Sequence, residues 1–224
     1  MVEFVAAAVV FFASHVLPAA SGLRTILINR VGHRAYLIAY SLVSLAALGW
    51  LVSAATRAPY VELWPPTRMA AILTLLAMLP ACILFAAGLS RPNPLSVAFV
   101  KSRGPANAPG ILAITRHPIL WAFLLWAASH VIANGDLIAV LMFGGFALFA
   151  LAGMSRLQQR AQRNLTASEF TSAMSVASGG FAVRLRRVAS PRFALEVMCG
   201  GLLYVLLLRL HGAVIGVAPL AMLH

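Results

Sequence analysis

The sequence predicts an all-α, polytopic membrane protein with about six transmembrane helices. Of its 224 residues, 62% are hydrophobic and only 10% are charged, whereas soluble domains contain about 45–50% apolar and about 25% charged residues. Long uncharged runs separate the charges, and each is long enough to cross about 30 Å of hydrocarbon. We expect helices because these runs are too long and too continuous for the strands of a membrane barrel.

Five uncharged runs and one weaker candidate are the expected spans. The runs cover residues 4–23, 35–56, 69–90, 117–135 and 137–155. The sixth candidate, residues 193–210, is interrupted by Glu196 and ends near Arg209, whose long side chain can extend to the membrane interface. We therefore expect one transmembrane domain over residues 1–224.

The basic residues predict the orientation of these spans. Fourteen of the seventeen lysines and arginines follow the first, third and fifth spans: Arg24, Arg30, Arg34, Arg91, Lys101, Arg103, Arg116, Arg156, Arg160, Arg163, Arg184, Arg186, Arg187 and Arg192. By the positive-inside rule this side is cytoplasmic. We expect a multi-pass protein of the inner (cytoplasmic) membrane with both termini in the periplasm. The net charge of +12 then indicates contact with anionic lipid in the bilayer, and no nucleic-acid partner is expected.

Two connecting segments carry clear local signals. Asn134-Gly135-Asp136 is short enough only for a tight turn, in which Gly135 can adopt a positive φ. Thr166-Ala167-Ser168-Glu169 has the spacing of a capping box and predicts the start of a helix that ends near Gly179-Gly180. Basic residues flank this helix on both sides, so we expect an amphipathic segment on the cytoplasmic lipid surface.

Histidines inside the predicted spans are the strongest functional signal. An imidazole is costly to desolvate in a bilayer, so we expect it to face the protein interior, paired, metal-bound or hydrogen-bonded. At about 1.5 Å per residue, His15 lies about 13 Å and His130 about 21 Å from the cytoplasmic edge. This offset suits two axial ligands of a tilted heme better than the ligands of one zinc ion. Alternatively, both histidines only hydrogen-bond within the helix bundle.

Other residues of the fourth and sixth spans extend this interpretation. Trp126 precedes His130 by four positions and shares its helix face, so it can form a wall of the same site. Arg116 and His117 stand at the cytoplasmic mouth of the fourth span, where they form either a cationic patch for a phosphate or carboxylate group or a pair among the lipid headgroups. His211, near the outer end of the sixth span, is an alternative partner for His130.

Four separated features of the sequence resemble the NnrU family of integral membrane proteins. They are His15 with Leu23-Arg24; Tyr36, Tyr40-Ser41, Ala58-Pro59 and Leu63-Trp64; Gly110-Ile111-Leu112 through Thr115-Arg116-His117-Pro118, Leu125-Trp126-Ala127, His130 and Asn134-Gly135-Asp136; and Leu210-His211 with Gly216 and Pro219-Leu220. The resemblance covers essentially the whole chain. It implies a membrane protein associated with nitrogen-oxide metabolism in denitrifying bacteria.

A related branch of the family sharpens the cofactor expectation. The 15-cis-ζ-carotene isomerase of plants and cyanobacteria is a heme b membrane enzyme, and its proposed axial ligands correspond to His15 and His130. The resemblance thus implies heme b at this pair, with a nitrogen oxide or a hydrophobic small molecule as partner. Ala127 stands where the isomerase has a cysteine that is proposed to exchange as heme ligand. A redox ligand switch of that form is therefore not available here.

Whether the protein is an enzyme is left open by the sequence. A heme-dependent cis–trans isomerase of a polyene such as ζ-carotene is one alternative to a redox protein. Arg116-His117-Pro118 also resembles the motif with which isoprenylcysteine and phospholipid methyltransferases bind S-adenosylmethionine, but the paired glutamates of those enzymes are missing, since Glu169 and Glu196 stand alone. A non-enzymatic accessory protein would use its histidines only for helix packing.

Overall fold

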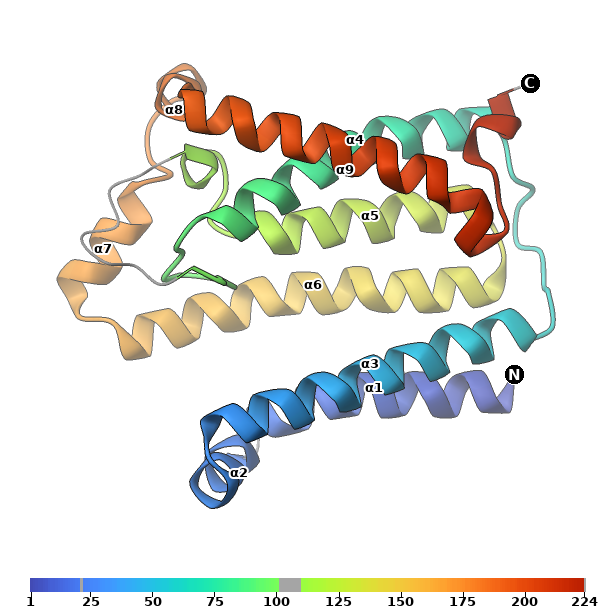
Figure 1. Cartoon of the computed structure of the whole chain (residues 1–224), viewed down its shortest axis with the longest axis horizontal. Helices are drawn as coiled ribbons and strands as arrows, with labels where there is room; N and C mark the ends of the chain where they lie inside the picture. The colour runs from blue at the N-terminus through green and yellow to red at the C-terminus, as the bar shows by residue number, and fades with distance from the viewer. Residues whose placement is uncertain (21, 101–109, 224) are drawn as a thin grey trace. The chain divides into compact units, whose positions relative to one another are not determined.

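The structure, a computed structural model, describes residues 1–20, 22–100 and 110–223 (Figure 1). The chain is about 80% helical, and the described residues contain no β-strand, which confirms the all-α prediction. The elements are α1 (Val2–Ala20), α2 (Leu23–Val31), α3 (His33–Arg57), α4 (Arg68–Ser90), the 3-10 turn η1 (Gly110–Ala113), α5 (Pro118–Asn134), α6 (Leu137–Asn164), α7 (Ala167–Ser175), α8 (Phe181–Val188), α9 (Pro191–Ile215) and the 3-10 turn η2 (Pro219–Leu223).

Four or five spans fit the described helices by length and composition. α3, α4, α6 and α9 are each long and apolar enough to cross a membrane, and α1 with α2 forms a bent pair that would make a fifth span. α5 has 17 residues, at the lower end of the roughly 17–25 residues that spanning helices use. The predicted count of about six is therefore approximate, because local signals shorten α5 and divide the first span.

Local signals set the ends of these helices. α5 begins with Pro118 at its first position and ends at Asn134, and the C-cap residue Gly135 that follows has φ 67°. A Cβ atom at Gly135 would collide with the backbone carbonyl of Trp64, so this turn requires glycine, as predicted. α6 continues to Asn164, beyond the predicted end of its span at residue 155, because arginines terminate an apolar run but not a helix.

The predicted capping box is present at the start of α7. The Thr166 side chain accepts from the Glu169 backbone N–H, and the Glu169 carboxylate accepts from the Thr166 backbone N–H. Hydrogen bonds from the hydroxyl and the backbone N–H of Thr166 lower the pKa of Glu169. α7 ends at Ser175, earlier than the predicted Gly179-Gly180, and a turn bridges to α8.

The first of two compact units comprises residues 1–63 and 136–142. In it α1 packs against α3, and each helix carries a completely buried residue, Ala7 in α1 and Leu51 in α3. The backbone N–H of Leu137 donates to the carbonyl of Val61 at 2.9 Å, which ties the start of α6 to the segment after α3.

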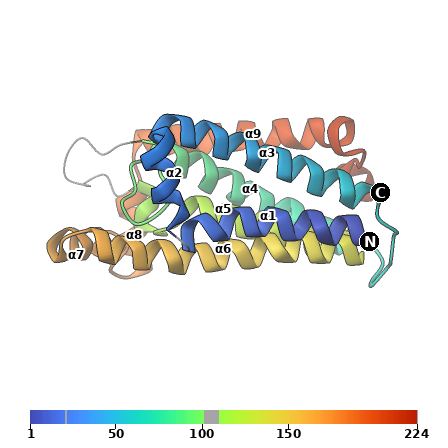
Figure 2. The same cartoon turned by 90° about the horizontal axis from the view of Figure 1, so that it is seen from below.

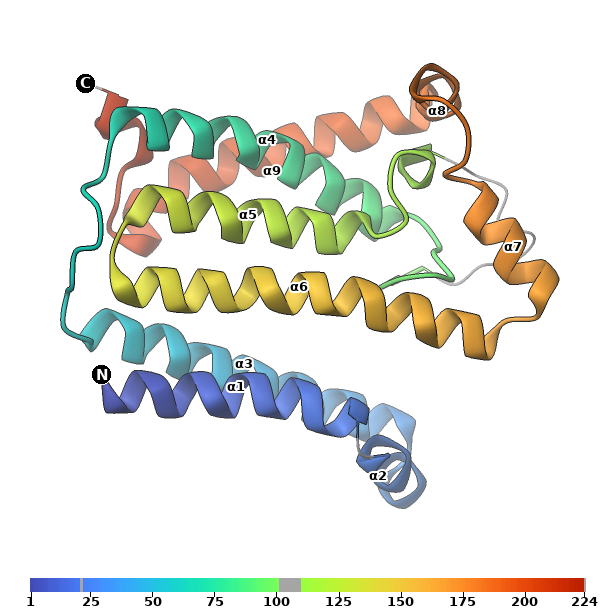
Figure 3. The same cartoon turned by 180° about the vertical axis from the view of Figure 1, so that it is seen from behind.

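The second unit comprises residues 64–135 and 143–224, and α4 is its central helix. α4 packs against both α5 and α9 (Figure 3). Figure 2 shows α7 and α8 at one end of this unit, which is the end where α9 begins. Glycines allow the close helix crossings: Gly88 of α4 lies against Ile119 of α5, and Gly200 of α9 lies against the backbone of Ile83 in α4. Small residues at such crossings are typical of membrane bundles.

Gly200 and its neighbour Gly201 provide a matched test of the α4–α9 crossing. A Cβ atom at Gly200 would lie 2.5 Å from Cα of Ile83, whereas one at Gly201 would meet nothing within 4 Å. We expect Gly200→Ala to lower the free energy of unfolding in detergent micelles by about 1–3 kcal/mol through overpacking. Gly201→Ala should leave it unchanged or raise it by up to about 1 kcal/mol through helix propensity. Equal effects of the two substitutions would contradict the close crossing.

Candidate functional site

His130 lies on α5 among aromatic side chains of the second unit. Its ring centre is 5.7 Å from that of Trp126 and 5.0 Å from that of Phe143 on α6. Phe146, one turn further along α6, stacks on Trp126 at 5.7 Å. Trp126 and His130 therefore share one helix face, as predicted, and α6 supplies the opposite wall of the cluster.

A backbone hydrogen bond determines the tautomer of His130. Its Nδ1 lies 2.8 Å from the carbonyl oxygen of Trp126. A carbonyl can only accept, so Nδ1 carries the proton and the neutral ring presents its lone pair at Nε2. In the described part of the chain, Nε2 of His130 has no hydrogen-bond partner. Metal-binding histidines commonly have this arrangement, in which the second ring nitrogen donates to a carbonyl or carboxylate.

The structure brings His211 of α9 to His130. The two ring centres are 6.4 Å apart and the ring planes differ by 30°. Nδ1 of His211 lies 2.7 Å from the carbonyl oxygen of Val217, in the segment that follows the left-handed Gly216 at the end of α9. His211 therefore also presents its lone pair at Nε2, and the two imidazoles form a pair of similar donors.

His15 lies in the first unit, on α1. Its Nδ1 is 2.7 Å from the carbonyl oxygen of Phe11 and 3.2 Å from Oγ of Ser14. Its ring packs against Phe11 at 4.4 Å and against Tyr40 of α3 at 5.8 Å. The predicted His15–His130 pair joins residues of different units and stays a prediction.

Few of the described side chains near His130 can bind a metal ion, so the site suits a cofactor that supplies most of the metal's ligands itself. Among the described residues, no group of three or more histidines, cysteines or carboxylates could hold a metal ion. A structural zinc site requires about four protein ligands, and His130 with one further imidazole supplies only two. Heme provides four equatorial nitrogens and takes one or two axial side chains, so these residues fit the predicted heme.

A buried polar cluster, separate from the aromatic cluster around His130, lies where α4 ends and α9 begins. Arg91 and Glu196 are almost fully buried, with side-chain exposures of 3% and 5%, and Nε of the arginine lies 2.8 Å from Oε1 of the glutamate. The Ser90 hydroxyl donates to the same oxygen at 2.6 Å. Gly110 lies directly against the guanidinium group, where any Cβ atom would collide with it. This ion pair fastens α9 to the end of α4.

The predicted residues Arg116 and His117 lie at the start of α5, where Asn93 of the loop after α4 holds the backbone. His117 is the N-cap residue of α5 and is buried, and Arg116 is half-buried. The Asn93 amide donates to the carbonyl of Arg116 at 2.8 Å, and the backbone N–H of His117 donates to the Thr115 hydroxyl at 3.2 Å. Both side chains thus occupy a position fixed by the loop after α4.

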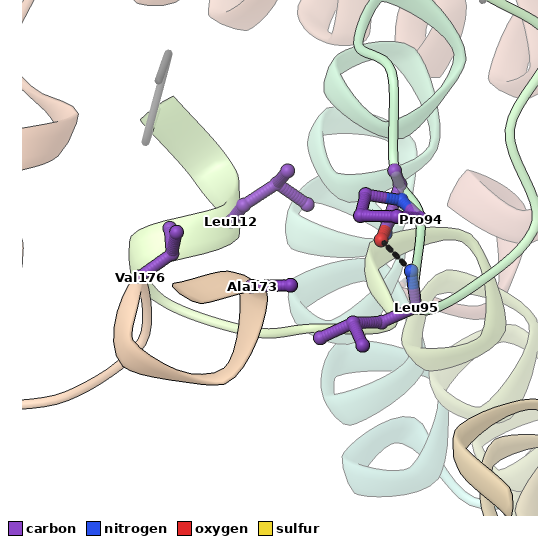
Figure 4. Close-up of a pocket in the computed structure, with 6 residues that line it drawn as sticks. Pro94, Leu95, Leu112, Ala173 and Val176 are labelled. Atoms are coloured by element: carbon purple, nitrogen blue, oxygen red, sulfur yellow. Dashed lines mark hydrogen bonds between the residues drawn. The ribbon is translucent and has the colours of Figure 1, made fainter. Parts of the chain in front are cut away.

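A small hollow next to Asn93 is too apolar to anchor a polar ligand (Figure 4). The other residues that line it are Pro94, Leu95, Leu112, Ala173 and Val176. Oδ1 of Asn93 already accepts from the backbone N–H of Leu95 at 3.0 Å. The candidate chemistry therefore lies with the histidines and the start of α5.

Comparison with known proteins identifies a family that matches this sequence. The sequence model of the family described as "NnrU protein" matches residues 3–219. The chain belongs to the NnrU family. The family match and the apolar helices together make it a multi-pass membrane protein. The matched range includes His15, His117, His130 and His211. No curated protein and no solved structure matches the chain.

Sequence reasoning missed the ion pair of this NnrU-family protein. In the sequence, Glu196 is an interruption of the sixth span and a glutamate that stands alone, and Arg91 is one of the cytoplasmic charges. A signal was available, because a carboxylate within an apolar span is stable only with a partner. The pattern does not show which of many arginines provides that partner.

We expect Glu196→Gln to destabilise the protein strongly. The substitution removes the negative charge that balances a buried guanidinium, and breaking a buried pair in this way costs about 3–5 kcal/mol. The free energy of unfolding in detergent micelles measures the loss. Glu3→Gln is the control, because the Glu3–Arg57 pair at 2.5 Å is solvent-exposed and should contribute little. A similar loss for both variants would contradict the role of the buried pair.

Proposed function

We propose that this NnrU-family protein binds heme b in the membrane through His130 and acts in redox or nitrogen-oxide metabolism. The observation that carries the proposal is the state of His130, whose Nδ1 is bonded to the Trp126 carbonyl while Nε2 presents a lone pair. The aromatic rings of Trp126 and Phe143 beside it offer apolar surface to a macrocycle. When bound, heme supplies an iron that exchanges one electron or binds a small ligand such as a nitrogen oxide.

Two histidines are candidates for the second axial position. The family resemblance supports His15, whose Nδ1 is also bonded to a backbone carbonyl. The geometry of the second unit supports His211, 6.4 Å from His130 between ring centres. His130 and His211 each present a lone pair at Nε2, and His130 would hold the heme iron together with His211 or His15. We retain His15 as the proposed ligand and His211 as its competitor.

The isomerase alternative receives no support from the position that follows Trp126. Ala127 is completely buried and carries no donor atom, so the proposal contains no exchange of axial ligands at this residue.

The orientation of the chain is part of the proposal. The positive-inside rule supports a cytoplasmic location of the arginine-rich ends, and we propose an inner-membrane protein whose His130 lies in the periplasmic half of the bilayer.

Absorption spectra of detergent-purified protein test the proposal. We expect the wild type from heme-supplemented cells to show a Soret band with a low-spin spectrum. His130→Ala should lower the bound heme at least about tenfold, because it removes an axial ligand. Alanine at the true second ligand, His15 or His211, should convert the remaining heme to a high-spin form.

His33→Ala is the control for these spectra, because His33 is exposed at the start of α3. Its spectrum should equal that of the wild type. A wild-type protein without a Soret band after heme supplementation, or a His130→Ala variant with unchanged heme content, would refute the proposal.

A further inference from the structure

Two adjacent side chains at the start of α5 contain buried nitrogens that have no hydrogen-bond partner in the described part of the chain. They are Nε of Arg116 and Nδ1 of His117. His117 as a whole is only 7% exposed. A buried polar group without a partner costs about 1–3 kcal/mol, so native proteins rarely keep one without a reason. The His117 side chain also hydrogen-bonds Gln158 of α6, so the two adjacent atoms without a partner are Nδ1 of His117 and Nε of Arg116.

The backbone around these groups is well fixed. Asn93 donates to the carbonyl of Arg116, and Pro118, the next residue after His117, is completely buried. A local rearrangement that exposes both side chains to water would have to break these contacts. Among the described residues, the fixed backbone leaves no other arrangement that would supply a partner, and we consider a bound anion in its place.

The acidic residues of the chain do not supply this partner. The chain contains only five. Glu196 is bonded to Arg91, and Glu169 closes the capping box with Thr166. The remaining three belong to the first compact unit: Glu3, Glu62 and Asp136. Within the described part of the second unit, no carboxylate is left to balance Arg116.

The helix itself adds positive potential at the same place. α5 has 17 residues and lacks a side-chain hydrogen bond at its N-cap. The first backbone N–H groups of such a helix point away from its body, and the helix dipole favours an anion before them. The Arg116 guanidinium and this helix end thus both add positive potential at the start of α5.

From these observations we infer that the start of α5 binds a phosphate-type oxyanion between Arg116 and His117. Guanidinium groups bind phosphate oxygens through charge-assisted hydrogen bonds. The predicted orientation puts this helix end at the cytoplasmic headgroup level, where the phosphate of an anionic lipid and free phosphate share the required chemistry. The inference is independent of the proposed heme site, because Arg116 and His130 stand near opposite ends of α5.

Thermal unfolding in a neutral detergent tests the site with two charge-matched variants. Arg116→Gln and Arg163→Gln each remove one positive charge, and Arg163 is exposed in the last turn of α6. Phosphatidylglycerol or inorganic phosphate is added as the probe. We expect the probe to raise the unfolding midpoint of the wild type and of Arg163→Gln by about 5 °C. Most of this rise should be lost in Arg116→Gln, whose heme absorbance should stay at the wild-type level.

The two probes distinguish the sources of the oxyanion. A rise with phosphatidylglycerol alone assigns the site to a lipid headgroup, and a rise with inorganic phosphate assigns it to a free anion. No rise with either probe, or an equal loss in both variants, overturns the inference.

If Arg116→Gln does not fold, Arg116→Lys decides the question. It keeps the charge but loses the planar guanidinium. The probe concentration for half-maximal stabilisation should then increase about tenfold, and an unchanged concentration overturns the inference.

Discussion

The absence of water from a bilayer core is the constraint on which this structure depends. Each polar group in the apolar helices needs a partner within the protein. The intramembrane histidines meet this demand through their own backbone, as His130 donates to the carbonyl four residues before it. The buried Arg91 and Glu196 meet it by pairing with each other. The hydrogen bond of His130 lies within α5, and the ion pair joins the end of α4 to α9.

The same constraint separates two kinds of site in the second unit. At the aromatic cluster, the bond from Nδ1 satisfies one side of the His130 ring and leaves the other side as a lone-pair donor, which suits a metal centre. At the start of α5, Nε of Arg116 and Nδ1 of His117 are buried without partners, and the positive charge of Arg116 suits an anion. One helix of 17 residues therefore has the lone pair of His130 near one end and the positive charge of Arg116 at the other.

Several features follow from the sequence alone because they depend on neighbours in the chain. The apolar runs gave the helices, and Thr166 with Glu169 gave the capping box. Asn134-Gly135-Asp136 gave the turn between α5 and α6, since only glycine accepts the left-handed conformation there without strain. Four-residue spacing also placed Trp126 and His130 on one face. The end of α6 was missed, because charge marks the membrane boundary and helix propensity continues beyond it.

Contacts between distant segments were decided only by the tertiary structure. Hydropathy cannot show that His211 lies beside His130 or that Gly200 rather than Gly201 meets the backbone of α4. Nor can it show that Glu196 pairs with the distant Arg91 in addition to Arg192 of its own helix. Each of these depends on the rotation and depth of one helix against another, which a helix's own composition leaves undetermined. The sequence by itself determined the family, the helices and the candidate histidines. Packing decided which side chains meet, because contacts between helices depend on how two helices are placed against each other.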